Sequence, residues 1–254
     1  MVGKHIVFGD IPQAVMTYLT ALDSNEDPTI QQIRKTLAAT HDFQQALRCF
    51  PSTYSFEKAL LNSLITTNND YIQALQQLPK NLLTMFIYAY QSYLFNKILS
   101  ERMKRHLPLN QAIPGDVIMP QTIRGFVDEY IAVSKVNFDK VNQQIKKKKA
   151  AITSVLIGAK TQFSQGEMGE IEQTIFQQEN LDQRLFIIPE IPYLSSSGTR
   201  RVLLAPVNNI STKLQDDTLY PARIAATVSF DLFKGCYATS LLREIMKSSS
   251  ITSY

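Results

Sequence analysis

Three glutamates near the middle of the chain are the first side chains whose types and spacing could support chemistry. Glu167, Glu170 and Glu172 stand close together, and paired carboxylates can cleave a glycosidic bond or help to bind a cation. No histidine lies beside them to complete a metal site, and the helix dipole favours acidic residues in the first turn of a helix. We therefore interpret this segment as the start of a helix and assign it neither a catalytic residue nor a metal.

The histidines and cysteines show no spacing typical of a catalytic or metal-binding group. His5, His41 and His106 are isolated from one another and from any nucleophile, and Cys49 and Cys236 are far apart. The sequence contains no Walker-type loop and no dinucleotide fingerprint. Its first residues lack the apolar run of a signal peptide, so we expect a cytoplasmic protein without a disulfide and without a membrane partner.

Basic residues offer a different chemistry, the binding of phosphate. The net charge of +4 is compatible with an RNA partner but does not require one. The run from Lys146 to Lys149 either contacts RNA phosphate or forms a solvated helix end. The sequence leaves both interpretations open.

The end of the chain has the pattern of a strand, a tight turn and a helix. Residues Ala225 to Phe233 alternate as a strand, Lys234-Gly235 forms a turn in which glycine can adopt a positive φ, and Tyr237 to Met246 forms a helix. Such a unit directs the N–H groups of the helix N-terminus toward a possible phosphate. From this motif alone, an ordinary closing unit of a mixed α/β fold is the favoured interpretation.

A long helix from Asn81 to Lys104 is the element around which the rest of the chain is organised. Aromatic side chains widen its apolar face, so we expect other elements to cover it on most sides, while its polar residues exclude a membrane span. The apolar positions at helical spacing are Leu83, Ile87, Tyr90, Leu94 and Ile98.

The segment before this helix reads as several short helices with acidic caps. Asp-x-x-x-Ala-(Val/Leu) occurs at Asp10, Asp42 and Asp70, and Asp27 precedes a proline that can open a further helix. The three copies also allow a helical repeat of the tetratricopeptide kind, which would bind proteins. Their unequal intervals of 32 and 28 residues and the absence of tryptophan argue against that alternative.

Beyond residue 110, prolines and β-branched residues replace the helical pattern. With 254 residues and 44% apolar content, the chain can form a packed core. We predict an α+β fold with a helical region (residues 1–110) and a strand-rich mixed lobe (residues 111–205). The lobe's predicted elements are strands at Asp116–Met119, Glu129–Val133, Ala151–Ile157, Arg184–Ile188 and Arg201–Ala205, and a helix within Val136–Lys149.

Three segments, in order, resemble one known family. The run Ala-Tyr-Gln-Ser-Tyr-Leu-Phe-Asn-Lys-Ile-Leu-Ser-Glu-Arg covers Ala89 to Arg102, Ser-Gly-Thr-Arg-Arg-Val-Leu-Leu covers Ser197 to Leu204, and Phe-Asp-Leu-Phe-Lys-Gly-Cys-Tyr-Ala-Thr-Ser-Leu-Leu-Arg-Glu covers Phe230 to Glu244. Together they resemble the C-terminal part of the archaeal TruD family of tRNA pseudouridine synthases.

The resemblance implies a domain division and an activity. Residues 1–205 correspond to the family's inserted domain, and residues 206–254 to a C-terminal strand-turn-helix of the pseudouridine synthase catalytic sheet. The implied reaction converts a uridine, expected at position 13 of tRNA, to pseudouridine by means of an aspartate nucleophile. The implied partner is tRNA, and no metal or organic cofactor is needed.

The family's nucleophile segment, of the Gly-x-Lys-Asp type, is not found in this sequence, and neither is the aromatic segment with Asn and Phe-Gly. Val2 to His5, followed by Gly9-Asp10, resembles the stretch just after that aromatic segment. We therefore expect a truncated chain, a split gene or a fragment, whose partner is the missing N-terminal catalytic segment. The resemblance assigns no catalytic residue to this chain and predicts that it makes no pseudouridine alone.

The resemblance also indicates which residues face RNA. Two positions depart from the family pattern, with Phe233 where proline is usual and Cys236 where serine is usual. Arg243 could instead be a buried ion-pair partner. The predicted RNA-binding residues are Lys234, Tyr237, Thr239 and Arg243, followed by Arg200 and Arg201. An RNA-binding module without chemistry and a helical protein-interaction scaffold remain the alternatives.

Overall fold

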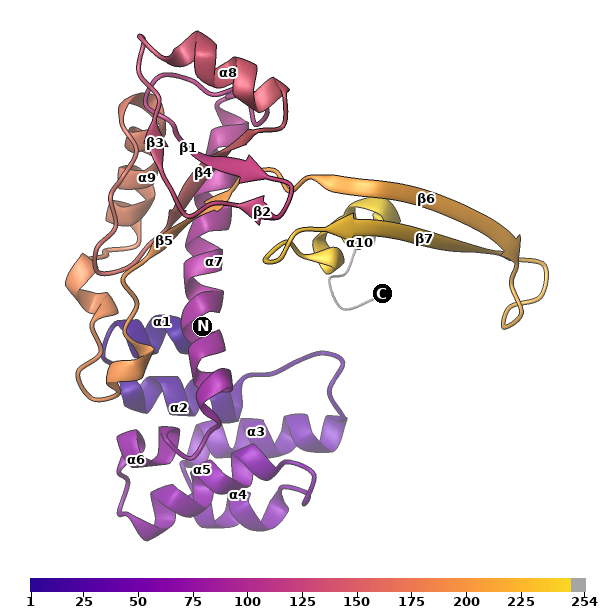
Figure 1. The fold of residues 1–254 in the computed structure, drawn as a ribbon. Helices are drawn as coiled ribbons and strands as arrows, with labels where there is room; N and C mark the ends of the chain where they lie inside the picture. Colours follow the sequence, from indigo (N-terminus) through magenta and orange to yellow (C-terminus); the bar gives the residue numbers. More distant parts are fainter. Residues whose placement is uncertain (248–254) are drawn as a thin grey trace. The chain divides into compact units, whose positions relative to one another are not determined.

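The computed structural model describes residues 1–247 and has a mixed α+β fold, with helices first and then a β-sheet accompanied by helices (Figure 1). The chain divides into two compact units. The first contains residues 1–101, 155–163 and 170–200, and the second contains residues 102–154, 164–169 and the chain from residue 201 onward. The predicted order of a helical region and a strand-rich region is confirmed.

Short helices with aspartate caps begin the first unit, as predicted. Asp10, Asp42 and Asp70 each accept a hydrogen bond from the backbone N–H three residues later, and Asp27 accepts one from Thr29. The helices that follow the three repeated phrases are 10, 7 and 5 residues long, so the phrase marks caps and not equal repeats. The helices are α1 Val2–Val7, α2 Ile11–Thr20, α3 Pro28–Thr40, α4 Phe43–Cys49, α5 Ser55–Thr66 and α6 Tyr71–Leu75.

Removal of one cap should have a modest effect on stability. Asp42→Ala removes the acceptor for the Gln45 N–H, which lies 2.8 Å from Asp42 Oδ1, and should lower the free energy of unfolding by about 1 kcal/mol. Urea unfolding of the purified chain measures this change. Asp42→Asn, which keeps a capping oxygen, is the matched control. Equal losses in the two variants would show that the cap is not the cause.

Helix α7 Lys80–Lys104 confirms the predicted long helix, but one expectation about it is wrong. Its predicted apolar stripe is buried, whereas Met85, Tyr88 and Tyr93 are exposed. Other elements therefore cover one face and not most sides, and the remaining face, which mixes polar, aromatic and methionine side chains, is exposed. On the covered face, the buried Gln91 donates hydrogen bonds to the Ile157 carbonyl (2.7 Å) and to Ser196 Oγ (2.9 Å).

A charged cluster joins distant segments of the first unit. Lys4 and Lys97 donate hydrogen bonds to the two carboxylate oxygens of Glu179, at 2.9 and 2.6 Å. Burial by itself would raise the pKa of Glu179, but the two lysines outweigh it and hold that pKa below the usual value. The two ion pairs of Glu179 therefore stabilise the fold at neutral pH, and this stabilisation is lost as the pH falls through the lowered pKa of Glu179.

The main sheet confirms several predicted strands. Its order is β2-β1-β4-β5, and β3 pairs with β1. The pairing of β1 with β4 is antiparallel and joins Ile118 to Ile152. The bounds are β1 Val117–Thr122, β2 Gly125–Phe126, β3 Ile131–Ala132, β4 Ala150–Leu156 and β5 Thr199–Val202, with helix α8 Phe138–Lys146 before β4 and α9 Gly166–Gln178 after it.

The predicted strand at Arg184–Ile188 is wrong. The residues form a 3-10 turn, η1 Gln183–Phe186, because Asp182 accepts a hydrogen bond from the Arg184 N–H (2.9 Å) and caps the turn. Within the run, Phe186 and Ile188 are buried, whereas Ile187 is exposed. A second 3-10 turn, η2 Pro192–Leu194, follows. The predicted Arg201–Ala205 strand reaches only Val202.

The end of the second unit is a hairpin followed by a helix. Its elements are β6 Val207–Asp216, β7 Ile224–Leu232 and α10 Ala238–Met246. β7, the turn with Gly235 at φ +88°, and α10 were predicted, whereas β6 was missed. Within the described part of the chain, β6 and β7 pair only with each other. Apolar side chains such as Ile210, Leu214 and Ile224 are exposed along the hairpin.

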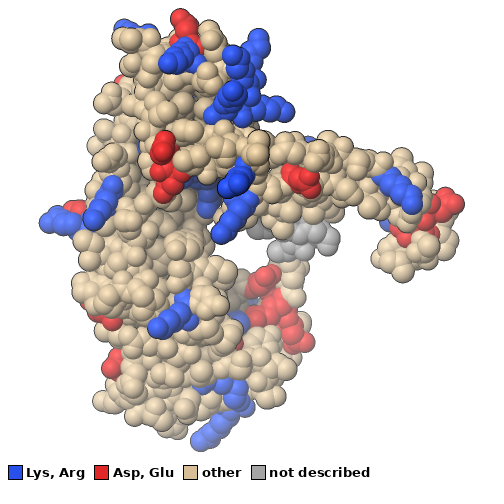
Figure 2. Space-filling view, in the orientation of Figure 1, with Lys and Arg blue, Asp and Glu red and all other residues tan. Residues whose placement is uncertain are grey.

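The surface of the described residues has a basic patch (Figure 2), and the hydropathy of their helices bears on a possible membrane span. Figure 2 shows Lys and Arg side chains gathered over the C-terminal end of α8. Among the described helices, none is long and apolar enough to cross a membrane.

Candidate functional site

Two of the predicted RNA-binding residues, Arg201 and Tyr237, meet in the second unit. Arg201 Nη2 donates a hydrogen bond to the Tyr237 hydroxyl (3.0 Å), and the Arg201 guanidinium carbon lies 5.2 Å from the centre of the Tyr237 ring. Arg201 lies in β5 and Tyr237 directly precedes α10, so the pair links the main sheet to the terminal helix. The Tyr237 side chain is 53% exposed. The pair therefore combines a half-buried cation with an exposed aromatic ring, and both types of side chain occur in nucleotide-binding surfaces.

The two positions that depart from the family pattern, Phe233 and Cys236, precede Tyr237 in the chain. Phe233 packs edge to face against Phe126 of β2, with ring centres 5.8 Å apart, and thereby fixes the end of the hairpin to the sheet. Burial raises the pKa of the Cys236 thiol, and the charge of Arg201 partly opposes that rise. Cys236 is therefore a half-buried thiol whose raised pKa disfavours the thiolate form.

The remaining predicted residues of the turn and helix are exposed. Lys234 lies in the turn, and Thr239 and Arg243 lie one turn apart on α10, which places them on the same face of the helix. The Tyr237 side chain makes no capping hydrogen bond at the start of α10. Arg243 is exposed in this chain, and its predicted role stays a prediction.

Arg200 has a different environment from its neighbour in sequence. In the first unit, Arg200 Nη2 lies 3.3 Å from the carboxylate of the fully buried Glu172, and Nη1 donates to the Gln162 carbonyl (2.9 Å). Its side chain is only 7% exposed. The guanidinium is thus held by protein oxygens, and any part of Arg200 in RNA binding would be indirect. Glu172 was placed by sequence in a helix, which is confirmed, but its pairing with Arg200 was not predicted.

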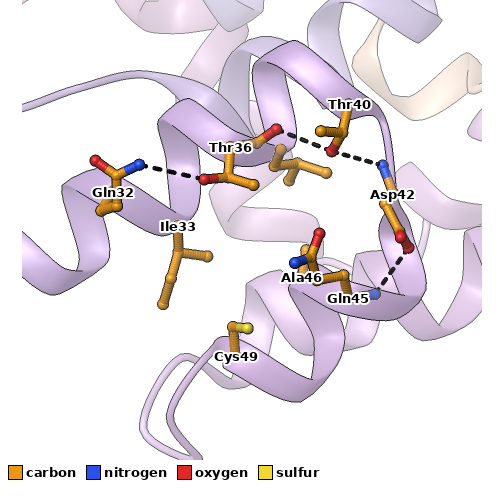
Figure 3. Close-up of a pocket in the computed structure, with 9 residues that line it drawn as sticks. Gln32, Ile33, Thr36, Thr40, Asp42, Gln45, Ala46 and Cys49 are labelled. Atoms are coloured by element: carbon orange, nitrogen blue, oxygen red, sulfur yellow. Dashed lines mark hydrogen bonds between the residues drawn. The ribbon is translucent and has the colours of Figure 1, made fainter.

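A small pocket in the first unit shows no feature of a binding site. It lies between α3 and α4, has a volume of about 180 Å³ and includes Cys49 in its wall (Figure 3). Its polar groups already bond to one another: Gln32 donates to Thr36, the Asp42 N–H to Thr40 Oγ1 and the Gln45 N–H to Asp42. The pocket is a packing defect between two helices. No group of His, Cys, Asp or Glu within residues 1–247 has a geometry suited to a metal ion.

Comparison with known proteins gives the same family as the sequence motifs. The family described as "tRNA pseudouridine synthase D (TruD)" matches residues 1–245. This chain belongs to the TruD family. The match extends over both compact units and includes the Arg201–Tyr237 pair.

Individual TruD relatives match almost the whole chain. The chain is 38% identical over 251 residues to a "Probable tRNA pseudouridine synthase D" of Methanosarcina barkeri and 36% identical to one of Thermoplasma acidophilum, with 97% and 95% of this chain covered. A crystal structure of a TruD protein from Methanosarcina mazei superposes with a TM-score of 0.88 at 34% identity. The chain spans about 57% of the length of the first of these relatives and of the solved structure.

Proposed function

We propose that this chain is the C-terminal part of a TruD-type tRNA pseudouridine synthase, a cytoplasmic isomerase that converts a uridine of tRNA to pseudouridine. Residues 1–205 form the inserted domain, and residues 206–254 supply the last elements of the catalytic domain. The chain brings no nucleophilic aspartate and depends on an N-terminal segment for it. The family match over residues 1–245 supports this proposal.

The observation that carries the proposal is the hairpin of β6 and β7. Its strands pair only with each other in the described structure, and its residues are largely exposed on both faces. An isolated two-stranded hairpin is marginally stable in water, and unpaired edges attract further strands. We infer that the hairpin joins the sheet of the catalytic domain, whose other strands come from the N-terminal segment. Co-expression of that segment with this chain tests the proposal, by co-purification and by pseudouridine formation.

Within this function, the exposed side chains of the turn and terminal helix face tRNA. Lys234 and Arg243 supply positive charge, Thr239 supplies a hydroxyl, and Tyr237 with Arg201 supplies a stacking surface. Arg200 positions β5 from its buried ion pair with Glu172.

A lysine substitution tests this arrangement in the reconstituted enzyme. Lys234→Ala should weaken tRNA binding and make the plot of log affinity against log salt concentration shallower by about one, because one phosphate contact is lost. Lys213→Ala, which removes an exposed lysine from β6, is the matched control and should leave the slope unchanged. An unchanged slope for Lys234→Ala would remove Lys234 from the RNA-facing group.

An RNA-binding module without chemistry is the second candidate. Binding contacts are spread over a surface and do not depend on a single nucleophile, so a module of this kind could bind RNA without catalysis. Absence of pseudouridine after reconstitution, with tRNA binding retained, would favour this candidate. The scaffold alternative has less support, because the N-terminal helices do not repeat in length.

A further inference from the structure

A wide groove in the second unit brings the lysine run beside the base of the hairpin. Its volume is about 790 Å³, far more than one phosphate or one side chain needs. One wall contains Lys147, Lys148 and Lys149, and the other contains Asn208, Asn209 and Asp231. We call this feature the lysine groove. It is distinct from the Arg201–Tyr237 pair, none of whose residues line it.

The protein backbone fixes the lysines in the groove wall. Helix α8 ends at Lys146, and Lys148 has a left-handed conformation at φ +55°, which turns the chain from the helix into β4. The Lys149 carbonyl then accepts a hydrogen bond from the Gln121 N–H at the end of β1 (2.8 Å). The three lysines are exposed, but their backbone N–H groups donate hydrogen bonds to carbonyls of α8, and the Lys149 carbonyl is bonded to β1. They therefore form a preorganised row of charge and not a frayed helix end.

An irregularity in the hairpin shapes the opposite wall. The register of β6 and β7 shifts between Asn208 and Ser211, and Asn209 has φ +50°. A bulge of this kind redirects side chains that would otherwise alternate along a strand. Asn209 Nδ2 donates to Asp231 Oδ2 (2.6 Å), so the carboxylate is hydrogen-bonded to a residue of the same wall. The groove thus contains three lysines and one carboxylate, that of Asp231, and it has an excess of positive charge.

We propose that the lysine groove binds the sugar–phosphate backbone of RNA, as a contact separate from the RNA-facing group at the turn and terminal helix. This inference rests on the proposed function for the identity of the polyanion. Lysine ammonium groups neutralise phosphates along one wall, and the asparagine amides of the other wall offer hydrogen bonds to phosphate and ribose oxygens. The contact positions the RNA without reading its sequence.

The salt dependence of tRNA binding by the full chain tests the lysine groove. A variant with Lys147→Gln, Lys148→Gln and Lys149→Gln should bind a transcribed tRNA roughly tenfold more weakly at 0.1 M salt, with a slope of log affinity against log salt shallower by about two. Arginine at the same three positions should retain the wild-type slope. The control variant, Lys35→Gln, Lys135→Gln and Lys140→Gln, removes the same charge from exposed lysines outside the groove and should change the slope little.

Lysine acylation of the wild-type chain, read by mass spectrometry, avoids any effect of mutation on folding. Bound tRNA should protect Lys147, Lys148 and Lys149 at least several-fold more than Lys135 and Lys140. Equal protection of both sets, or no measurable tRNA binding at low salt, would overturn the inference. Equal protection of the groove by polyglutamate at the same charge concentration would also overturn it and assign the groove to acidic polypeptides.

These results are separable from the test of the enzyme. A slope unaffected by the glutamine variant would refute the lysine groove even if the reconstituted enzyme makes pseudouridine. Conversely, a reconstituted enzyme that makes none, while tRNA still protects the groove lysines, would refute the proposed function and leave the RNA contact in place.

Discussion

The purified chain is expected to release no tritium above background from tRNA labelled at C5 of uracil. Covalent cleavage of a glycosidic bond needs a positioned carboxylate nucleophile, and we propose that the N-terminal segment supplies it. Several aspartates of the chain are already bound in structural contacts. Asp10, Asp42 and Asp70 cap helices, and Asp116 is fully enclosed in an ion pair.

Addition of the N-terminal segment in trans should restore turnover, because the unpaired hairpin offers the strand edges at which the catalytic sheet can reassemble. Without the segment, tritium release should be undetectable, since no other residue can replace a positioned nucleophile. The same N-terminal segment with asparagine in place of the aspartate of its Gly-x-Lys-Asp motif is the matched control and should give no turnover. Tritium release by this chain alone would mean that one of its own aspartates is the nucleophile.

Asp116→Ala is expected to destabilise the second unit by about 3–5 kcal/mol, the range typical for breaking a buried ion pair. Arg102 and Asp116 have fully buried side chains and form a two-pronged contact, with Nη1–Oδ1 at 2.6 Å and Nη2–Oδ2 at 2.9 Å. The Ile113 N–H also donates to Asp116 (2.9 Å), and Arg102 donates to the Pro108 carbonyl. Loss of the carboxylate would leave a buried guanidinium without its counter-charge.

Urea unfolding, with hydrogen exchange over residues 102–154 to localise the effect, measures this loss. The double variant Arg102→Met with Asp116→Leu should recover part of it, because replacement of both charges removes the unpaired ion. Asp128→Ala, at an aspartate that bonds to the exposed Tyr130, is a surface control and should change stability by less than about 0.5 kcal/mol. A loss of under about 1 kcal/mol for Asp116→Ala would show that the pair contributes little.

Structural features that depend on only a few neighbouring residues could be predicted from the sequence. The caps at Asp10, Asp42 and Asp70, the stripe along α7, the glycine turn at Gly235 and the strands β1 and β4 were all predicted and are confirmed. Each depends on local hydrogen bonds or on the periodicity of one element, which the order of residues specifies directly. The family motifs likewise identified TruD, because their order and spacing are properties of the chain itself.

The errors came from elements whose state depends on neighbours. An apolar run at Arg184–Ile188 reads as a strand but forms a turn whose Phe186 is fully buried in the core. Strand β6 was missed because its bulge at Asn208–Asn209 interrupts the alternation that would reveal it.

Only the tertiary structure decided which distant residues meet. It pairs Arg201 with Tyr237, Arg102 with Asp116 and Arg200 with Glu172, and it sets the lysine run against the hairpin. No residue pattern encodes these contacts, since they arise when strands and helices far apart in sequence pack into one core. The sequence by itself determined the family and the helical and strand-rich halves. The packing determined which of the predicted basic residues face solvent and which are held inside by protein oxygens.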